Sequence, residues 1–340
     1  MEKKNKKKDR KKRLLSLILL LFLSVILLGT STYAWFTSNK SVKVDTLDVH
    51  VETQNGLQIS TDATNWKTVI NTTDITTGYS GAVNQLPANL EPVSTGKVVD
   101  TNTGYLNMYY GVVATNAGGE YILTSSKSTE TNSSGVDSQG KFIAFDLFFK
   151  VEKDTPLYLT TSSSVIAKDG SADQGLKNAT RVAFLVEGTS DLSATPATIQ
   201  GLKGATDGTT YIWEPNYDVH TDAGVANARD VYGITTTKEG GNLLPYDGVI
   251  SDITSDNDVL LSNAKAASFD TLFKSVTPSY KTDAAFGGSA QAYVPIFTVN
   301  AGVTKVRVYM WVEGQDVDCE NNASGTDISF NLHFSANASA

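Results

Sequence analysis

The sequence has few of the residues that build covalent cross-links or metal sites. Among its 340 residues there is one cysteine, Cys319, and there are three histidines, His50, His220 and His333. A single cysteine excludes an internal disulfide, so an apolar core has to stabilise the fold. The histidines are far apart and form no His-Glu-x-x-His pair, so the zinc-peptidase pattern is absent.

Motifs of common enzymes are missing as well. There is no Gly-x-Ser-x-Gly elbow and no glycine-rich phosphate loop. Cys319 lies in an acidic stretch, which disfavours the reactive thiolate form. No Leu-Pro-x-Thr-Gly signal or apolar tail follows Phe334, so covalent attachment to a cell wall is not expected. We therefore predict that the protein is not an enzyme.

Basic residues are scarce outside the N-terminus. The chain has 28 basic and 36 acidic residues, and nine of the basic but only two of the acidic ones fall in residues 1–34. The rest of the chain therefore carries a net charge of −15. Such an acidic surface keeps a protein soluble and argues against nucleic acid or anionic lipid as a partner.

One long apolar run is present, from Leu14 to Leu28, between the basic N-terminus and a stretch of small residues that ends at Ala34. This layout is typical of a secretory signal peptide, cut by a signal peptidase between Ala34 and Trp35. As a helix the run reaches about 22 Å, less than the roughly 30 Å hydrocarbon core of a membrane. The alternative is an uncleaved membrane anchor, which would be the chain's only contact with the membrane. In either case we expect residues 35–340 to be extracellular or at the cell surface.

The exported part alternates apolar and polar residues with the period of two that is typical of β-strands. The alternation is clear from Phe142 to Val151, from Lys305 to Glu313 and from Ile328 to Phe334, while Arg181 to Glu187 reads as a strand buried on both faces. We predict an all-β fold: a two-sheet, jelly-roll-like sandwich over residues 35–340 with long loop insertions, notably around 188–248. The signal or transmembrane helix over residues 1–34 precedes it.

The first expected strand contains an irregularity. Alternation from Val42 to Val44 and alternation from Leu47 to Glu52 differ in phase by one residue. An extra residue in one strand shifts the phase in this way, as does an interruption of the strand, so we predict a β-bulge or a break near Thr46.

An acidic stretch near the C-terminus carries alternating carboxylates at Asp316, Asp318 and Glu320. Carboxylate oxygens are ligands that Ca²⁺ prefers, although the spacing does not match an EF-hand loop. The two interpretations are a Ca²⁺ site, the only cofactor considered, and a solvated acidic loop.

An aromatic segment includes Tyr211, Trp213 and Tyr217. These rings could stack against a sugar, or they could pack an insertion onto the sandwich.

The junction after the apolar run, Thr32-Tyr33-Ala34-Trp35-Phe36 followed by Thr46-Leu47-Asp48, resembles that of the TasA/camelysin family of exported Gram-positive proteins. The segment from Trp311 to Asp316, with Cys319, is similar to a motif of related surface proteins. The first resemblance covers roughly residues 14–52 and implies a jelly-roll subunit of extracellular biofilm-matrix fibres. It also implies cleavage by a dedicated signal peptidase and insertion of the freed N-terminal strand into the next subunit.

The hypothesis is thus a structural fibre subunit that assembles by donor-strand addition, with copies of itself or related surface proteins as partners. Its strand anchors would be Trp35, Phe36, Val42 and Val44. The simpler interpretation is that this segment completes its own sheet. The alternative function is a secreted or membrane-tethered adhesin or carbohydrate-binding protein that uses the aromatic segment.

Overall fold

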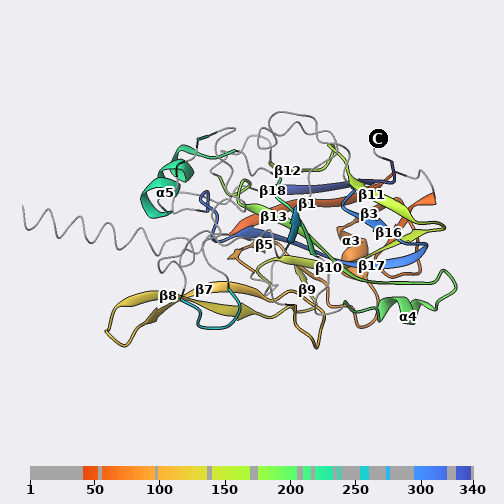
Figure 1. The fold of residues 1–340 in the computed structure, drawn as a ribbon, viewed down its shortest axis with the longest axis horizontal. Coiled ribbons are helices and arrows are strands. Elements are labelled where there is room, and N and C mark those ends of the chain that lie inside the picture. The colour runs from red at the N-terminus through yellow and green to blue at the C-terminus, as the bar shows by residue number, and fades with distance from the viewer. Residues whose placement is uncertain are drawn as a thin grey trace, which may run out of the picture.

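The computed structural model describes residues 41–52, 56–95, 99–135, 140–168, 175–204, 210–215, 219–232, 235, 237–238, 253–259, 273–275, 295–319 and 327–337. Within these ranges nearly all regular structure is β-sheet (Figure 1), as the alternating sequence predicts. Short helices lie between the strands: α3 (Thr72–Thr77), α4 (Pro196–Gln200) and α5 (Asp222–Tyr232). Within the described part of the chain, no helix has the length and apolar character needed to cross a bilayer.

The smaller sheet has seven strands and combines the two ends of the described chain. Its order is β16-β11-β18-β1-β3, with β12 also paired to β18 and β5 also paired to β1. Its strands are β1 (Val42–Val51), β3 (Val69–Asn71), β5 (Asn89–Leu90), β11 (Thr155–Leu159), β12 (Ser164–Ala167), β16 (Phe297–Val299) and β18 (Ile328–Ser335). The first strand, β1, is therefore an interior strand, parallel to the last strand, β18.

The larger sheet has nine strands in the order β15-β14-β13-β17-β10-β4-β9, with β2 paired to β10 and β6 paired to β17. Its strands are β2 (Gln58–Ser60), β4 (Gln85–Pro87), β6 (Pro92–Val93), β9 (Ser133–Gly135), β10 (Ile143–Val151), β13 (Thr180–Ser190), β14 (Thr210–Trp213), β15 (Phe273–Ser275) and β17 (Gly302–Glu313). The long antiparallel strands β13, β17 and β10 form its centre.

The two sheets face each other across one apolar core. As predicted, Phe145, Leu147 and Phe149 share a face of β10 and point into this core. Phe334 of β18 packs edge-on against Phe149, with ring centroids 5.3 Å apart, and against Phe184 of β13 at 5.6 Å. Aromatic rings thus join the sheets, and the prediction of an all-β sandwich is confirmed.

The larger sheet is buried on its outer face as well. All twelve residues of β17 are buried, and β13 is buried through Leu185, which confirms the prediction of a doubly buried strand there. The outer face is covered by a second apolar cluster that includes Met108, Tyr309 and Trp311, and by α4 through Ile199. The segment around 188–248 is therefore not wholly a loop insertion, because it supplies α4 to this cover and β14 to the sheet.

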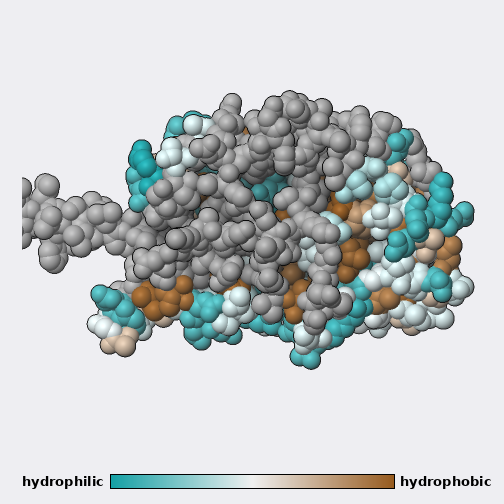
Figure 2. Space-filling model, viewed as in Figure 1, coloured by the Kyte–Doolittle hydropathy of each residue, from teal (hydrophilic) through white to brown (hydrophobic). Residues whose placement is uncertain are grey.

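An antiparallel hairpin, β7 (Met108–Thr115) and β8 (Tyr121–Ser128), extends to one side of the sandwich (Figure 1). Residues 253–259 run along β8, where the Ser125 amide donates to the Asp258 carbonyl over 2.9 Å. Val112 and Val113 of β7 are exposed, and Figure 2 shows apolar surface over the hairpin among the mostly polar described surface.

Candidate functional site

The predicted donor segment, Trp35 to about Val44, overlaps the start of β1, which lies between two neighbours in the smaller sheet. On one side its pairing with β18 runs from Val44↔Ile328 to Val51↔Phe334. On the other side it pairs with β5 at Val42 and Lys43 and with β3 from Asp48 to His50. Both edges of β1 are therefore occupied by backbone hydrogen bonds, and in this structure the strand completes the sheet of its own chain.

The side chains of β1 alternate between the core and the solvent. Val42, Leu47, Val49 and Val51 are buried in the main core, and Val44 packs against it partly buried. Two of the four predicted anchors, Val42 and Val44, thus contact apolar residues as an anchor should. The other two, Trp35 and Phe36, and the predicted cleavage site at Ala34, lie outside the described residues.

The predicted bulge is confirmed next to these anchors. Val44 pairs with Ile328 and Thr46 pairs with Ser329, so Asp45 is the extra residue on β1. Because one residue is inserted, Leu47, Val49 and Val51 all face the core despite the change of phase after Val44.

Two ion pairs surround the bulge. The Lys168 Nζ, just after β12, lies 2.8 Å from the Asp45 Oδ1, and the Lys43 Nζ lies 3.3 Å from the Asp327 Oδ2. Lys168 also lies 3.6 Å from the Asp327 carboxylate, which makes the four side chains one continuous chain of alternating charge. The hydrogen bond from Lys168 lowers the pKa of Asp45, and Asp45 raises the pKa of Lys168.

Further along the same strand pair, His50 and His333 lie directly opposite each other on the outer face of the sheet. Their rings are stacked, with centroids 4.4 Å apart and planes within 9°. Burial, and then the neighbouring His50, lower the pKa of His333, while Glu52 and Asp48 oppose that shift. Both histidines thus lie on the outer face of paired strands.

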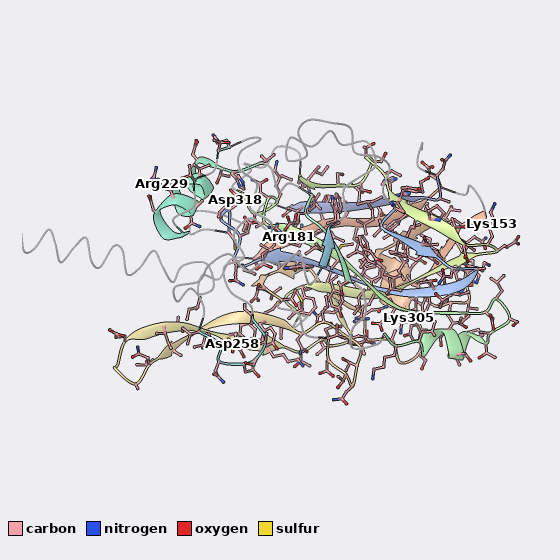
Figure 3. All side chains as sticks on the ribbon, in the orientation of Figure 1. Lys153, Arg181, Arg229, Asp258, Lys305 and Asp318 are labelled. Carbon is pink, nitrogen blue, oxygen red and sulfur yellow. The ribbon has the colours of Figure 1, made fainter. Side chains whose placement is uncertain are left out.

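The predicted Ca²⁺ ligands Asp316 and Asp318 have protein partners instead. The Asp316 carboxylate forms an ion pair with the buried guanidinium of Arg181, and the Asp318 Oδ2 lies 2.7 Å from the His220 Nδ1. The Asp318 Oδ1 accepts hydrogen bonds from the amide and hydroxyl groups of Thr221 just before α5. In Figure 3 the labelled Asp318 lies beside α5 while Arg181 lies further into the sandwich.

This region is a structural joint rather than the solvated loop that was the other interpretation, because both aspartates are buried. Glu320, the third predicted ligand, lies outside the described residues. In the ranges that the structure describes, no three His, Cys, Asp or Glu side chains are grouped so that they could hold a metal ion.

The aromatic segment packs onto the sandwich, as one of its two interpretations expected, and not as a glycan-stacking surface, which was the other. Trp213 is 3% exposed and belongs to the main core, so neither face of its indole is free for a sugar. Tyr211 is half-buried against Phe297, with ring centroids 5.4 Å apart. The third predicted residue, Tyr217, lies outside the described residues.

A buried cluster of charges on the outer face of the larger sheet was not predicted. The Arg307 Nη1 donates to the Asp146 Oδ1 over 2.8 Å, and its Nη2 forms an ion pair with Glu130. The Lys305 Nζ lies 3.2 Å from the Asp146 Oδ2, which also accepts a hydrogen bond from the Tyr79 hydroxyl over 2.7 Å. Burial would raise the pKa of Asp146, but Arg307 and Lys305 lower it.

Sequence signals for this cluster were present. Asp146 interrupts the apolar strand β10, and Lys305 and Arg307 occupy alternate positions of the apolar strand β17. In the structure Asp146 and Arg307 are directly opposite each other across the two strands. Charged residues at alternate positions of strongly apolar strands, such as Lys305 and Arg307 in β17, therefore indicated a buried face with ion pairs and not a solvated face.

Glu187 borders the same cluster, at the point where β13 has a register shift against β17 between Val186 and Gly188. One of its oxygens accepts a hydrogen bond from the Gly204 amide, and the other is buried without a hydrogen-bond partner. Burial raises the pKa of Glu187 to about 7, and the bond from Gly204 and the charge of Lys305 only partly offset this effect. The cluster has the composition of a polar core.

Comparisons with known proteins assign no relative: no family model matches the chain, and neither a curated protein nor a solved structure is similar to it.

Proposed function

We propose that the chain is an exported, non-catalytic structural protein, a subunit of extracellular matrix or surface fibres that assemble by addition of the N-terminal strand. In this proposal residues 1–34 direct export as a signal peptide or membrane anchor, the host is a Gram-positive bacterium, and the sandwich is of the jelly-roll type. The partner is a second copy of the chain or a related surface protein.

The observation that carries the proposal is the position of β1. It is the first described strand, yet it lies inside the smaller sheet between β18 and the strands β3 and β5. Its withdrawal would leave a groove with free backbone groups on both edges and the apolar core as its floor. A strand with the same apolar pattern, from the same chain or from another one, can pair with these groups and cover the core, which is the physical basis of strand exchange.

The test asks whether β1 of one copy enters the sheet of another. Thr46 and Ser329 lie directly opposite each other on β1 and β18, so cysteines at these positions are placed for a disulfide. One chain carries Thr46→Cys and the other Ser329→Cys, and both are exported by the host and mixed; the native Cys319 is buried. We expect an intermolecular disulfide in material of high molecular weight.

Two controls complete this design. Thr46→Cys mixed with Asn331→Cys should cross-link far less, because position 331 lies opposite Asp48. A chain that lacks residues 35–44 should stay monomeric. If Thr46→Cys and Ser329→Cys join only when both are in one chain, at every protein concentration, then β1 stays in its own sheet and the proposal is wrong.

A further inference from the structure

We propose that the ion-paired side chains around the bulge, Lys43 and Asp45 of β1 with Lys168 and Asp327, fix the register of the N-terminal strand and thereby select the strand of a second copy of this chain. We call these four residues the charged collar. The inference rests on the proposed function, since it names what the groove recognises in an incoming strand.

The need for such a device follows from the apolar pattern of β1. A slip of one residue would turn Leu47, Val49 and Val51 toward solvent, so the core excludes it. A slip of two residues keeps the same face inward and replaces one aliphatic side chain by another over most of the strand. The core therefore discriminates poorly between the observed register and its two-residue neighbours.

The charged collar excludes the slips that the core permits. Lys43 and Asp45 are two residues apart and opposite in sign, and they contact Asp327 and Lys168, also opposite in sign. A two-residue slip in one direction places Lys43 against Lys168, and a slip in the other direction places Asp45 against Asp327. Each slip thus replaces attraction by repulsion between like charges.

The bulge positions the Asp45 side chain of the charged collar. Asp45 is the inserted residue, so its side chain is exposed and reaches over β18 to Lys168 beyond the end of β12. The backbone holds the acceptor side rigid, because the Lys168 amide donates to the Asp327 carbonyl over 2.8 Å. The two recognising charges therefore lie just before β18, which borders the groove, and just after β12, which pairs with β18, while the two recognised charges lie on the strand that enters the groove.

Charge reversal tests the inference. A donor-reversed chain carries Lys43→Glu and Asp45→Lys, and an acceptor-reversed chain carries Lys168→Glu and Asp327→Lys. Within either population alone, the charges on the incoming strand and those beside the groove have the same sign where they meet, so addition between identical chains is disfavoured. In an equimolar mixture every strand meets a matching groove, so the two chains should alternate in one fibre. A chain with all four reversals is the matched control, because it restores every pair.

Disulfides report the register. With Asp48→Cys as the reporter on β1, Asn331→Cys captures the observed register, and Ser329→Cys or His333→Cys captures the two slips. We expect the in-register share of cross-links to fall roughly threefold or more in the donor-reversed chain alone and in the acceptor-reversed chain alone. The share should recover in their mixture and in the chain with all four reversals. Because the pairs are exposed, 1 M salt should remove most of the difference.

The outcomes separate this inference from the proposed function. If intermolecular cross-links form with the same in-register share in all variants, the role of the collar is refuted and strand addition stands. If cross-links form only within chains, strand addition is refuted, while the same reporters still show whether the collar sets the register of the chain's own β1. An unchanged in-register share within chains would then overturn the inference as well.

Discussion

Replacement of Glu187 by Gln should stabilise the protein at pH 8 and leave its stability near pH 4 almost unchanged. Burial raises the pKa of this carboxyl group from its ordinary 4.5 to about 7 in the folded protein. The folded state therefore binds more protons than the unfolded state between these two values. It follows that the contribution of the Glu187 side chain to the free energy of unfolding is greatest below pH 4.5, where the carboxyl group is protonated in both states. This contribution is lost as the pH rises through about 7, where the buried group ionises.

The magnitude comes from the size of that shift. A difference of roughly 2.5 pKa units corresponds to about 3 kcal/mol, at about 1.4 kcal/mol per unit. Glu187 is 3% exposed, so solvent does little to screen its charge. Glutamine keeps an oxygen that can accept the hydrogen bond of the Gly204 amide and cannot ionise. We therefore expect Glu187→Gln to raise the free energy of unfolding by about 2 to 3 kcal/mol at pH 8.

The assay is urea unfolding of the purified chain at pH 4, 6 and 8, followed by tryptophan fluorescence, with the difference between wild type and variant as the measured quantity. Glu152→Gln is the matched control, because Glu152 is exposed and its replacement should change little at any pH. A variant that is less stable than wild type at pH 8, or a difference that does not grow from pH 4 to pH 8, would refute the reasoning.

Two further predictions concern the other charged groups. Arg307→Met should lower the free energy of unfolding by about 3 to 5 kcal/mol, because it removes the cation that is paired with Glu130 and leaves Asp146 with Lys305 as its only ion-pair partner among the described residues, whereas Met at the exposed Arg229 should have little effect; equal losses would contradict this account. Acidification should weaken the pairing of β1 with β18, because the lowered pKa of His333 lets the unfolded state bind more protons as the pH falls below about 6.5. His50→Gln should reduce this acid-induced loss in a pH series of urea unfolding, and an identical pH dependence would show that the stacked pair is not responsible.

The charge clusters bear differently on stability and on assembly. The Arg307 cluster is buried, so its pairing holds strands β10 and β17 together whatever the ionic strength. The collar at β1 is exposed, so each of its pairs contributes little to stability and more to the choice of register. The proposed strand exchange needs this division, because the groove must stay folded while the strand is absent.

Several features could be predicted from the sequence because they depend on near neighbours in the chain. The period-two alternation of β10 indicated its core-facing residues, and the change of phase after Val44 indicated a bulge or a break near Thr46, which the structure shows to be a bulge at Asp45. Both follow from the geometry of an extended strand, in which successive side chains point to opposite faces. The apolar density of the strand that begins near Arg181 likewise gave its burial on both faces.

The remaining features depended on contacts between residues far apart in the chain. The sequence left open whether Trp213 stacks against a sugar or packs onto the sandwich, and it did not show that Asp318 pairs with His220; in the structure Trp213 lies in the main core and Asp318 forms that pair. The local sequence shows that a side chain is aromatic or acidic. It does not show which distant part of the chain packs against that side chain and buries it.

By itself, then, the sequence determined the β class, the faces of the main strands and the bulge, because these depend on local backbone geometry and on the burial of apolar side chains. Only the tertiary structure decided that β1 lies beside β18, that Arg307 meets Asp146 and Glu130, and that Lys43 and Asp45 meet opposite charges. Strand pairing is chosen by the closure of long loops and by the fit of two surfaces, and period-two alternation is compatible with many such pairings.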